Sequence, residues 1–224
     1  MAYILNIETS TTNCSVAIFN DLNLIEFAEV NTGDYSHSKS LHVFIDSILK
    51  KSKISPKDLS AISVSKGPGS YTGLRIGVAS AKGLCFALDI PLISIETLKI
   101  LSQNILNKGT VIPCLDARRM EVYSAVFDID NKMIRDTRAE IINENSFEEY
   151  LEENDVYFIG NANEKLKKII TNKNAKFIDN HFPSAKQMGL LSFNKFKSNR
   201  FEDLNNFEPF YLKDFVGTKW NPNQ

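Results

Sequence analysis

Residues 2–19, AYILNIETSTTNCSVAIF, and residues 110–127, TVIPCLDARRMEVYSAVF, open the two halves of the chain in the same way. Each is an apolar run that ends in a carboxylate, Glu8 or Asp116, and then passes through a polar turn into a second apolar run. Apolar runs bounded by turn residues are typical of buried strands. These matching openings predict one folding unit that is used twice. At an offset of 108 residues the matching pairs are Ile4/Ile112, Glu8/Asp116, Ala17/Ala125, Ile18/Val126 and Phe19/Phe127.

The elements that follow the first opening can be read from turn residues and apolar spacing. A third strand, LIEFAEV, comes after a turn at residues 20–23. Apolar residues then recur at helical spacing from Leu41 to Leu49. The strand AISVS, a helix over residues 72–88 and the strand PLISI complete the first half.

The second half repeats this order. The strand IRDTRAEII precedes a helix over SFEEYLEEN, in which Ser146 and Glu149 have the spacing of a capping box. The strand VYFIGN, the helix NEKLKKII and the strand KFID follow, and Ser184 opens a last helix. Consecutive strands favour antiparallel pairing and strand–helix–strand units favour parallel pairing, so each sheet should be mixed.

Two βββαβα lobes in one chain resemble the architecture of the actin-like ATPases, also called ASKHA proteins, which are built from ribonuclease H-like lobes. We therefore predict an α/β fold with duplicated lobes and mixed sheets. The N-terminal lobe, which we expect to bind a partner, should cover residues 1–106. The C-terminal lobe should cover residues 107–224, and its last helix and tail could pack back on the first lobe.

The composition limits the classes of function. The 224 residues carry 26 basic and 27 acidic side chains, a net charge of −1. Without a basic face across a whole domain, we do not expect tight unaided binding to nucleic acid. No apolar stretch reaches the roughly 20 residues that span a membrane, and the N-terminus has no leader pattern, so we expect a cytoplasmic protein without membrane contact. Three widely spaced cysteines in apolar runs predict buried thiols.

The stretch KGPGSYTGLRIGVASAKGL, residues 66–84, combines a helix start with a stripe of small residues. Ser70 or Thr72 can cap the helix, and from Gly73 onward small residues recur every four positions on one face. Glycine in a helix interior costs roughly 1 kcal/mol relative to alanine, so close packing should offset that cost. The stripe fits packing within the lobe or packing against a partner subunit. We disfavour phosphate binding at the helix start because no Gly-Lys-Ser/Thr follows at P-loop spacing.

The hydroxyl side chains of residues 9–12 fill the turn after Glu8. Hydroxyl and backbone N–H groups in such a turn can form an anion site, and an acid at each strand end could help to place a metal-bound phosphate. The alternative is a hairpin turn that satisfies its own side chains. The candidate nucleotide or phosphate contacts are Glu8, Ser10, Thr11 and Asp116.

Three motifs lie in order along the chain. They are GPGSYTGLRIG at residues 67–77, LDARRMEVYSAVF at residues 115–127 and FEPFYLKDF at residues 207–215. With the hydroxyl-rich opening, they resemble the TsaB (YeaZ) family, whose members take part in bacterial tRNA threonylcarbamoyladenosine synthesis. Lys213 and Met120 stand where that family commonly has Arg and Gly.

The resemblance implies a non-catalytic subunit that binds and activates a TsaD-like transferase, the enzyme that places threonylcarbamoyl on N6 of the adenosine beside the tRNA anticodon. It also implies a TsaE-like ATPase as a further partner and tRNA contact through the complex. The first lobe would make the contact, and an exposed apolar face would favour homodimers when the partner is absent. The candidate partner-interface residues are Leu41, Phe44, Ile45, Ile48, Gly73, Leu74, Gly77, Val78, Ala81 and Cys85.

TsaD proteins carry two metal-binding histidines after a similar Pro-Leu-Ile strand, whereas this chain has PLISIETLKIL at residues 91–101. Thr97 and Leu101 occupy the two positions, and neither can replace an imidazole ligand. His37 and His42 are five residues apart, which excludes a HExxH site. We therefore expect no metal site, no catalytic residue and no cofactor required by this chain, although ATP or ADP with Mg could bind in the complex. The enzyme alternatives are an ATP-binding ASKHA kinase or hydrolase acting alone and a metalloprotease, which the missing histidines disfavour.

Overall fold

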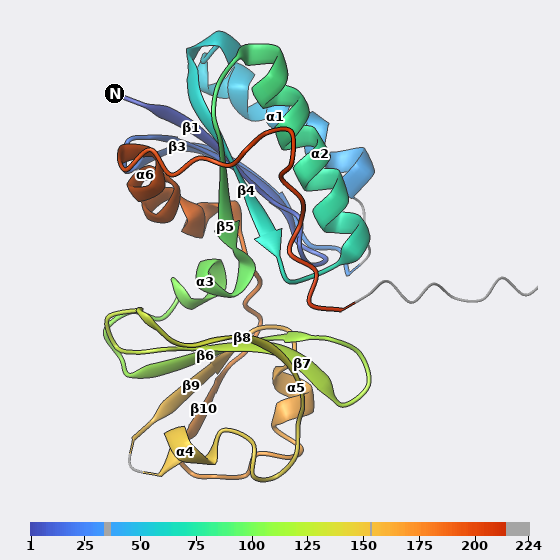
Figure 1. Cartoon of the computed structure of the whole chain (residues 1–224), viewed down its shortest axis with the longest axis vertical. Helices are drawn as coiled ribbons and strands as arrows, with labels where there is room; N and C mark the ends of the chain where they lie inside the picture. Colours follow the sequence, from blue (N-terminus) through green and yellow to red (C-terminus); the bar gives the residue numbers. More distant parts are fainter. Residues whose placement is uncertain (34–36, 153, 214–224) are drawn as a thin grey trace, which may run out of the picture.

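The computed structural model describes residues 1–33, 37–152 and 154–213 as two five-stranded α/β lobes that lie one above the other (Figure 1). The strands of the first lobe are β1 Tyr3–Glu8, β2 Cys14–Asn20, β3 Asn23–Val30, β4 Leu59–Gly67 and β5 Leu92–Glu96. The strands of the second lobe are β6 Thr110–Asp116, β7 Glu121–Phe127, β8 Met133–Ile141, β9 Val156–Ile159 and β10 Ala175–Ile178.

Both sheets have the same topology. Their strand orders are β3-β2-β1-β4-β5 and β8-β7-β6-β9-β10. In each lobe the first three strands pair antiparallel, and the two strands after the helices pair parallel. The predicted duplicated α/β architecture with mixed sheets, that of the ASKHA proteins, is therefore confirmed. The expected lobe boundary near residue 106 falls between α3 and β6.

Helices cover the sheets unequally. In the first lobe α1 and α2 lie side by side on one face, and in the second lobe only short helical turns occupy the equivalent connections (Figure 1). None of the described helices is long and apolar enough to cross a membrane. The helical segments are α1 His37–Ser52, η1 Pro56–Asp58, α2 Tyr71–Leu88, α3 Thr97–Ser102, α4 Glu148–Leu151, α5 Asn163–Leu166, η2 Ala185–Met188 and α6 Gly189–Lys197.

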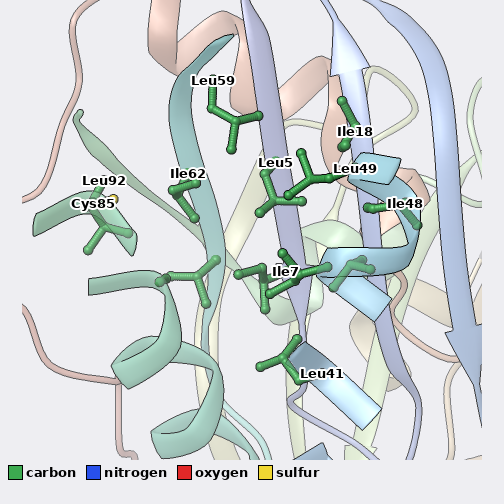
Figure 2. Close-up of a cluster of buried hydrophobic side chains, with 14 of the residues drawn as sticks. Leu5, Ile7, Ile18, Leu41, Ile48, Leu49, Leu59, Ile62, Cys85 and Leu92 are labelled. Atoms are coloured by element: carbon green, nitrogen blue, oxygen red, sulfur yellow. The ribbon is translucent and has the colours of Figure 1, made fainter. Parts of the chain in front are cut away.

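The main core of the first lobe lies between its sheet and the helices α1 and α2. Figure 2 shows side chains from both helices, among them Leu41 and Cys85, meeting Leu5 and Ile62 of the sheet. Alternating strand positions and one stripe of each helix supply this layer, as the apolar spacing predicts. The cysteines Cys14, Cys85 and Cys114 are all buried and free, which confirms the expected buried thiols.

The capping box predicted at Ser146 does not form. The N-cap position of α4 is Phe147, and the Ser146 hydroxyl instead accepts a hydrogen bond from the Asn143 backbone N–H at 3.0 Å. Phe147 adopts a φ of +65° and packs its ring edge-on against Phe158, with centroids 5.5 Å apart. Local turn hydrogen bonds and burial of this ring outweigh the capping pattern, so α4 is shorter than predicted, as is α5.

The offset of 108 residues holds for the second strand of each lobe and is wrong for the first. Ile18 and Val126 both face the helices of their lobes. In contrast, Ile4 packs on the face opposite α1 and α2, whereas Ile112 packs on the helix face of the second sheet. The residue that structurally matches Ile4 is Val111, because the second hairpin loop is one residue shorter than the first.

This slip also affects the two carboxylates that end the strands. A shift of one residue turns a side chain to the other face of a sheet. By strand alternation, Glu8 lies on the face opposite the helices, and Asp116 lies on the helix face of its own sheet. The pairing of Glu8 with Asp116 as equivalent positions is therefore a register error.

The chain returns to the first lobe after β10. η2 and α6 pack against β1, β2 and β5, on the face opposite α1 and α2. Residues 200–213, which we call the C-terminal strap, then run from the β5 edge across the flank of α2 (Figure 1). The last helix and the part of the tail that is described thus belong spatially to the first lobe.

Candidate partner interface and nucleotide site

The turn between β1 and β2, residues 9–13, is closed over by the start of α2. The Thr9 hydroxyl donates to the Gly73 carbonyl at 2.8 Å. The Ser70 backbone N–H donates to the Ser10 carbonyl at 2.6 Å. Both hydrogen bonds join the turn to α2, so this segment is held by the helix and not by its own side chains alone.

Glu8, the last residue of β1, lies directly before this turn and is completely buried. Its Oε1 accepts the Ser10 backbone N–H at 2.6 Å. Burial raises the pKa of Glu8 to about 7, although hydrogen bonding with Ser10 lowers this pKa in part. Ser10 and Thr11 are also buried. Glu8 Oε2 and the Ser10 hydroxyl are buried without a hydrogen-bond partner among the described residues. In this arrangement these oxygens have almost no exposed surface for a Mg–nucleotide.

Asp116 lies in a different setting. Its side chain is 45% exposed and forms an ion pair with Lys165. One carboxylate oxygen also accepts the Arg118 backbone N–H at 2.9 Å, and the Asn161 side chain accepts the Asp116 backbone N–H. Asp116, Asn161 and Lys165 border a cavity of about 350 Å³ in the second lobe. Glu8 is thus enclosed in the first lobe, whereas Asp116 borders a cavity of the second lobe.

The small-residue stripe of α2 faces the turn beneath it. A Cβ added at Gly73 would overlap the Thr9 carbonyl oxygen, and one added at Gly77 would overlap the Thr9 hydroxyl. Ala81 and Cys85 continue the same buried face. Of the two packing interpretations of the stripe, the structure supports packing within the lobe.

The candidate interface residues are largely inside the first lobe. Phe44 is half-buried and the other nine are buried, so their side chains offer little or no surface to a partner. Hydrophobic spacing identifies the face of a helix that packs on its own sheet, and these residues form that face. The nine buried residues are Leu41, Ile45, Ile48, Gly73, Leu74, Gly77, Val78, Ala81 and Cys85.

The opposite face of α1 and α2 is exposed and partly apolar. Phe86 is 82% exposed and Val43 is 62% exposed. Ala79, Gly83 and Phe86 are spaced four and three residues apart along α2 and therefore share one side of the helix. Ala79 and Gly83 are also exposed, whereas Val43 belongs to α1. Nothing lies within 4 Å of a Cβ added at Gly83. We call Val43, Ala79, Gly83 and Phe86 the outer face. Sequence reasoning missed it, although apolar residues outside the buried stripe were a usable signal.

The two positions that carry metal-binding histidines in TsaD proteins are core positions here. Thr97 and Leu101 of α3 are completely buried, and Leu101 packs with Val111 and Phe127 of the second sheet. Within residues 1–33, 37–152 and 154–213, no group of three His, Cys, Asp or Glu side chains could hold a metal ion.

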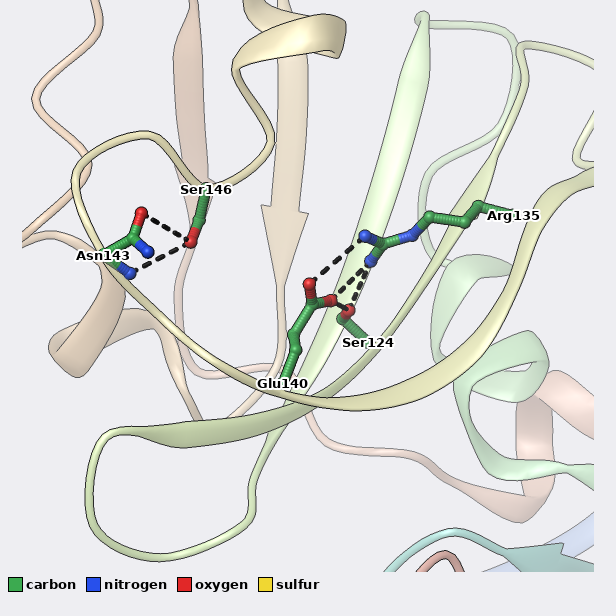
Figure 3. A network of polar contacts seen from close by, with 5 residues as sticks. All are labelled: Ser124, Arg135, Glu140, Asn143 and Ser146. Atoms are coloured by element: carbon green, nitrogen blue, oxygen red, sulfur yellow. Dashed lines mark hydrogen bonds and ion pairs between the residues drawn. The ribbon is translucent and has the colours of Figure 1, made fainter.

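A partly buried ion pair lies in the second lobe and has a structural explanation. Figure 3 shows the Arg135 guanidinium of β8 pointing at the Glu140 carboxylate and the Ser124 hydroxyl of β7. Arg135 also lies over the Phe147 ring, 5.0 Å from its centroid. Because the charges are paired and joined to a β7 hydroxyl, the network connects the two strands and does not present a reactive group.

The family model described as TsaD, tRNA N6-adenosine threonylcarbamoyltransferase, matches residues 33–218. The chain belongs to this family. It is 38% identical over 133 residues to the tRNA threonylcarbamoyladenosine biosynthesis protein TsaB of Bacillus subtilis, a match that covers 58% of this chain and 57% of that protein. It is 28% identical over 221 residues to the TsaB of Buchnera aphidicola subsp. Baizongia pistaciae, which covers 94% of this chain and 98% of that one.

The matched region thus spans little more than half the length of the Bacillus subtilis relative. A solved structure of an uncharacterized protein from Pseudomonas aeruginosa with similarity to the peptidase YEAZ superposes with a TM-score of 0.82 at 23% identity, over 95% of this chain and all of that chain. At that identity the likeness supports the fold. Together these matches confirm the TsaB (YeaZ) resemblance predicted from the motifs.

Proposed function

We propose that this chain is a non-catalytic subunit of tRNA N6-threonylcarbamoyladenosine synthesis that docks a TsaD-like transferase on its outer face. Two curated relatives are named biosynthesis proteins of this modification, which supports the pathway. The observation that carries the docking proposal is the outer face itself, where Phe86 is exposed on the same side of α2 as the small residues Ala79 and Gly83, and Val43 is exposed on the neighbouring α1.

The outer face has the shape and chemistry of a helix-packing surface. Small side chains at Ala79 and Gly83 allow the backbone of another helix to approach closely, and Phe86 and Val43 supply apolar area at the border. The His42 ring and the Ser80 hydroxyl, 3.2 Å apart, join α1 and α2 across their contact. Two helices held side by side can receive one or two helices of a partner. The same face would pair two copies of this chain when the transferase is absent.

The transferase chemistry is assigned to the partner. Neither Thr97 nor Leu101 can replace an imidazole ligand, and both are enclosed in the core. In this proposal the chain needs no cofactor of its own, and ATP or ADP with Mg binds elsewhere in the complex. A TsaE-like ATPase joins the complex, which operates in the cytoplasm. The alternative of an ATP-using enzyme acting alone relies on Glu8, Ser10, Thr11 and Asp116. The first three are buried, and Asp116 is partly exposed but paired with Lys165.

The test is co-purification with the TsaD-like protein of the same organism, using Gly83→Arg. Open space at Gly83 lets the new side chain extend outward without disturbing the lobe, so the variant should stay folded and lose the complex. Asn194→Arg adds the same charge to the exposed side of α6, on the other side of the sheet, and should bind normally. A Gly83→Arg variant that binds like the wild type would overturn docking at the outer face. Turnover of Mg-ATP by the isolated chain would overturn the non-catalytic role.

A further inference from the structure

The C-terminal strap carries aromatic and basic side chains to the junction of the two lobes. The Phe210 backbone N–H donates to the Lys66 carbonyl at 2.6 Å, which holds the strap against the end of β4. Three residues later Lys213 forms an ion pair with Glu121 at the start of β7. The strap therefore connects the first turn of α2 with the second lobe.

On the first-lobe side, two tyrosines and an arginine form a stack. The Tyr71 and Tyr211 rings have centroids 4.6 Å apart and an interplanar angle of 33°. The Arg75 guanidinium carbon lies 4.1 Å from the Tyr71 ring centroid, and its Nε donates to the Tyr211 hydroxyl at 3.4 Å. Arg75 is exposed and the tyrosines are half-buried. A planar, cationic and aromatic surface thus faces solvent at the start of α2.

On the second-lobe side, Tyr123 is half-buried between charged groups. Burial raises the pKa of Tyr123. Tyr123 lies two residues from Glu121 on the same face of β7, and the Glu121 backbone N–H donates to the Arg118 carbonyl at 3.2 Å. Arg118 is exposed in the turn between β6 and β7, where its φ is +69° and its backbone N–H is fixed by Asp116. The turn therefore lies next to Glu121, the residue that pairs with Lys213 of the strap.

We propose that this aromatic and basic patch binds a single-stranded segment of RNA, with bases stacking on the tyrosine and arginine planes and phosphates beside the lysine and arginine cations. Stacking on aromatic rings flanked by basic groups is how proteins hold unpaired nucleotides without reading their sequence. The inference rests on the proposed function, because RNA is the substrate of that pathway, but the patch is separate from the outer face. The patch consists of Tyr71, Arg75, Arg118, Tyr123, Tyr211 and Lys213.

The charges set the strength of this binding. Glu121 pairs with Lys213, and the charge of Glu208 acts on Arg75, so three cations are partly balanced by two acids. The isolated chain should therefore bind RNA weakly and at low salt. For single strands, each neutralised phosphate contributes a slope of about 0.7 to the dependence of binding on salt, so three contacts predict a total slope of about 2.

The experiment measures fluorescence anisotropy of a labelled single-stranded oligoribonucleotide of about 12 nucleotides, with the full chain, at about 20 mM and about 200 mM salt. Tyr211→Ala should weaken binding at least about fivefold, because one stacked base is lost, and Tyr211→Phe should retain it. Arg75→Lys keeps the charge and removes the plane, so it should also weaken binding. Lys57→Ala, which removes a positive charge before the opposite end of β4, is the matched control and should bind like the wild type.

Several results would overturn the proposal. One is the absence of RNA binding at low salt, and another is an equal loss of RNA affinity in Lys57→Ala and Tyr211→Ala. Unchanged affinity in Arg75→Lys would also contradict it. Competition by AMP as strong as that by the unlabelled oligoribonucleotide would indicate a free-nucleotide site. Circular dichroism and urea unfolding establish that each variant is folded. Co-purification of Tyr211→Ala with the TsaD-like protein separates the two claims, since the RNA patch can fail while docking on the outer face is retained.

Discussion

The two faces of α2 use the same residue type for opposite purposes. On the inner face, Gly73 and Gly77 allow the helix to lie directly on the Thr9–Ser10 turn, and no side chain larger than hydrogen fits. On the outer face, Gly83 has open space around it. The spacing of small residues along a helix therefore does not by itself show which segment packs against them. The inner contact is within the lobe, and the outer one is available to a partner.

The largest effect should come from Gly73→Ala. The added Cβ would overlap the backbone carbonyl oxygen of Thr9, and a backbone atom in a central turn cannot move aside cheaply. We expect the free energy of unfolding to fall by about 4 kcal/mol, at the high end for overpacking. Urea denaturation measures this loss. A variant as stable as the wild type would show that α2 can move away from the turn.

Glu8→Gln should change how stability depends on pH. The pKa of Glu8 is raised from 4.5 to about 7 in the folded chain, so between these values the folded state holds a proton that the unfolded state has released. The contribution of Glu8 to the free energy of unfolding is therefore fully present below pH 4.5. It is lost as the pH rises through 7, by about 3 kcal/mol in all.

The Gln variant carries no such proton, so its advantage over the wild type should grow across this range of pH. Denaturant titrations of both proteins from pH 4.5 to pH 8 provide the measurement. If the free energy of unfolding depended on pH in the same way for both proteins, Glu8 would not be held protonated in the folded chain.

Gly77→Ala should destabilise the fold less than Gly73→Ala, because the obstacle is the hydroxyl of Thr9 and not backbone. We expect a loss of about 2 kcal/mol. In a Thr9→Ala background the obstacle is absent, so the second substitution should cost at least about 1 kcal/mol less than it does alone. A double-mutant cycle by urea unfolding measures this coupling, and strict additivity would place the clash elsewhere.

The smallest effect, and one of opposite sign, is expected for Gly83→Ala. Alanine is favoured over glycine in a helix interior by about 1 kcal/mol, and open space at Gly83 imposes no steric cost. The thermal midpoint should rise, and docking of the TsaD-like protein should tolerate the added methyl group better than Gly83→Arg. Loss of stability in Gly83→Ala would mean that the two faces of α2 are equally packed.

Much of the fold could be predicted because the relevant forces are local. Apolar runs, helical spacing and turn residues gave all ten strands and the two long helices of the first lobe, since these patterns follow from the periods of strand and helix. The failures lie where local signals compete. Ser146 hydrogen bonds within its own turn and Phe147 is drawn into the core, so α4 begins later than its capping pattern indicates.

The candidate site was harder to predict for a geometric reason. A stripe such as Gly73, Gly77 and Ala81 records that something approaches closely, and the same stripe suits a neighbouring turn or a second protein. Similarly, the matched carboxylates Glu8 and Asp116 look equivalent until a loop shorter by one residue turns one of them to the other face.

The sequence by itself determined the duplicated α/β lobes, the family resemblance and the replacement of the metal-binding histidines by Thr97 and Leu101. These depend on residue identity and on periods along the chain. Only the tertiary structure decided which face of α2 is buried, that the hydroxyl-rich turn is enclosed, and that the strap brings Tyr211 to Tyr71. Those outcomes depend on which distant segments meet, and burial is a property of that meeting and not of any single stretch of residues.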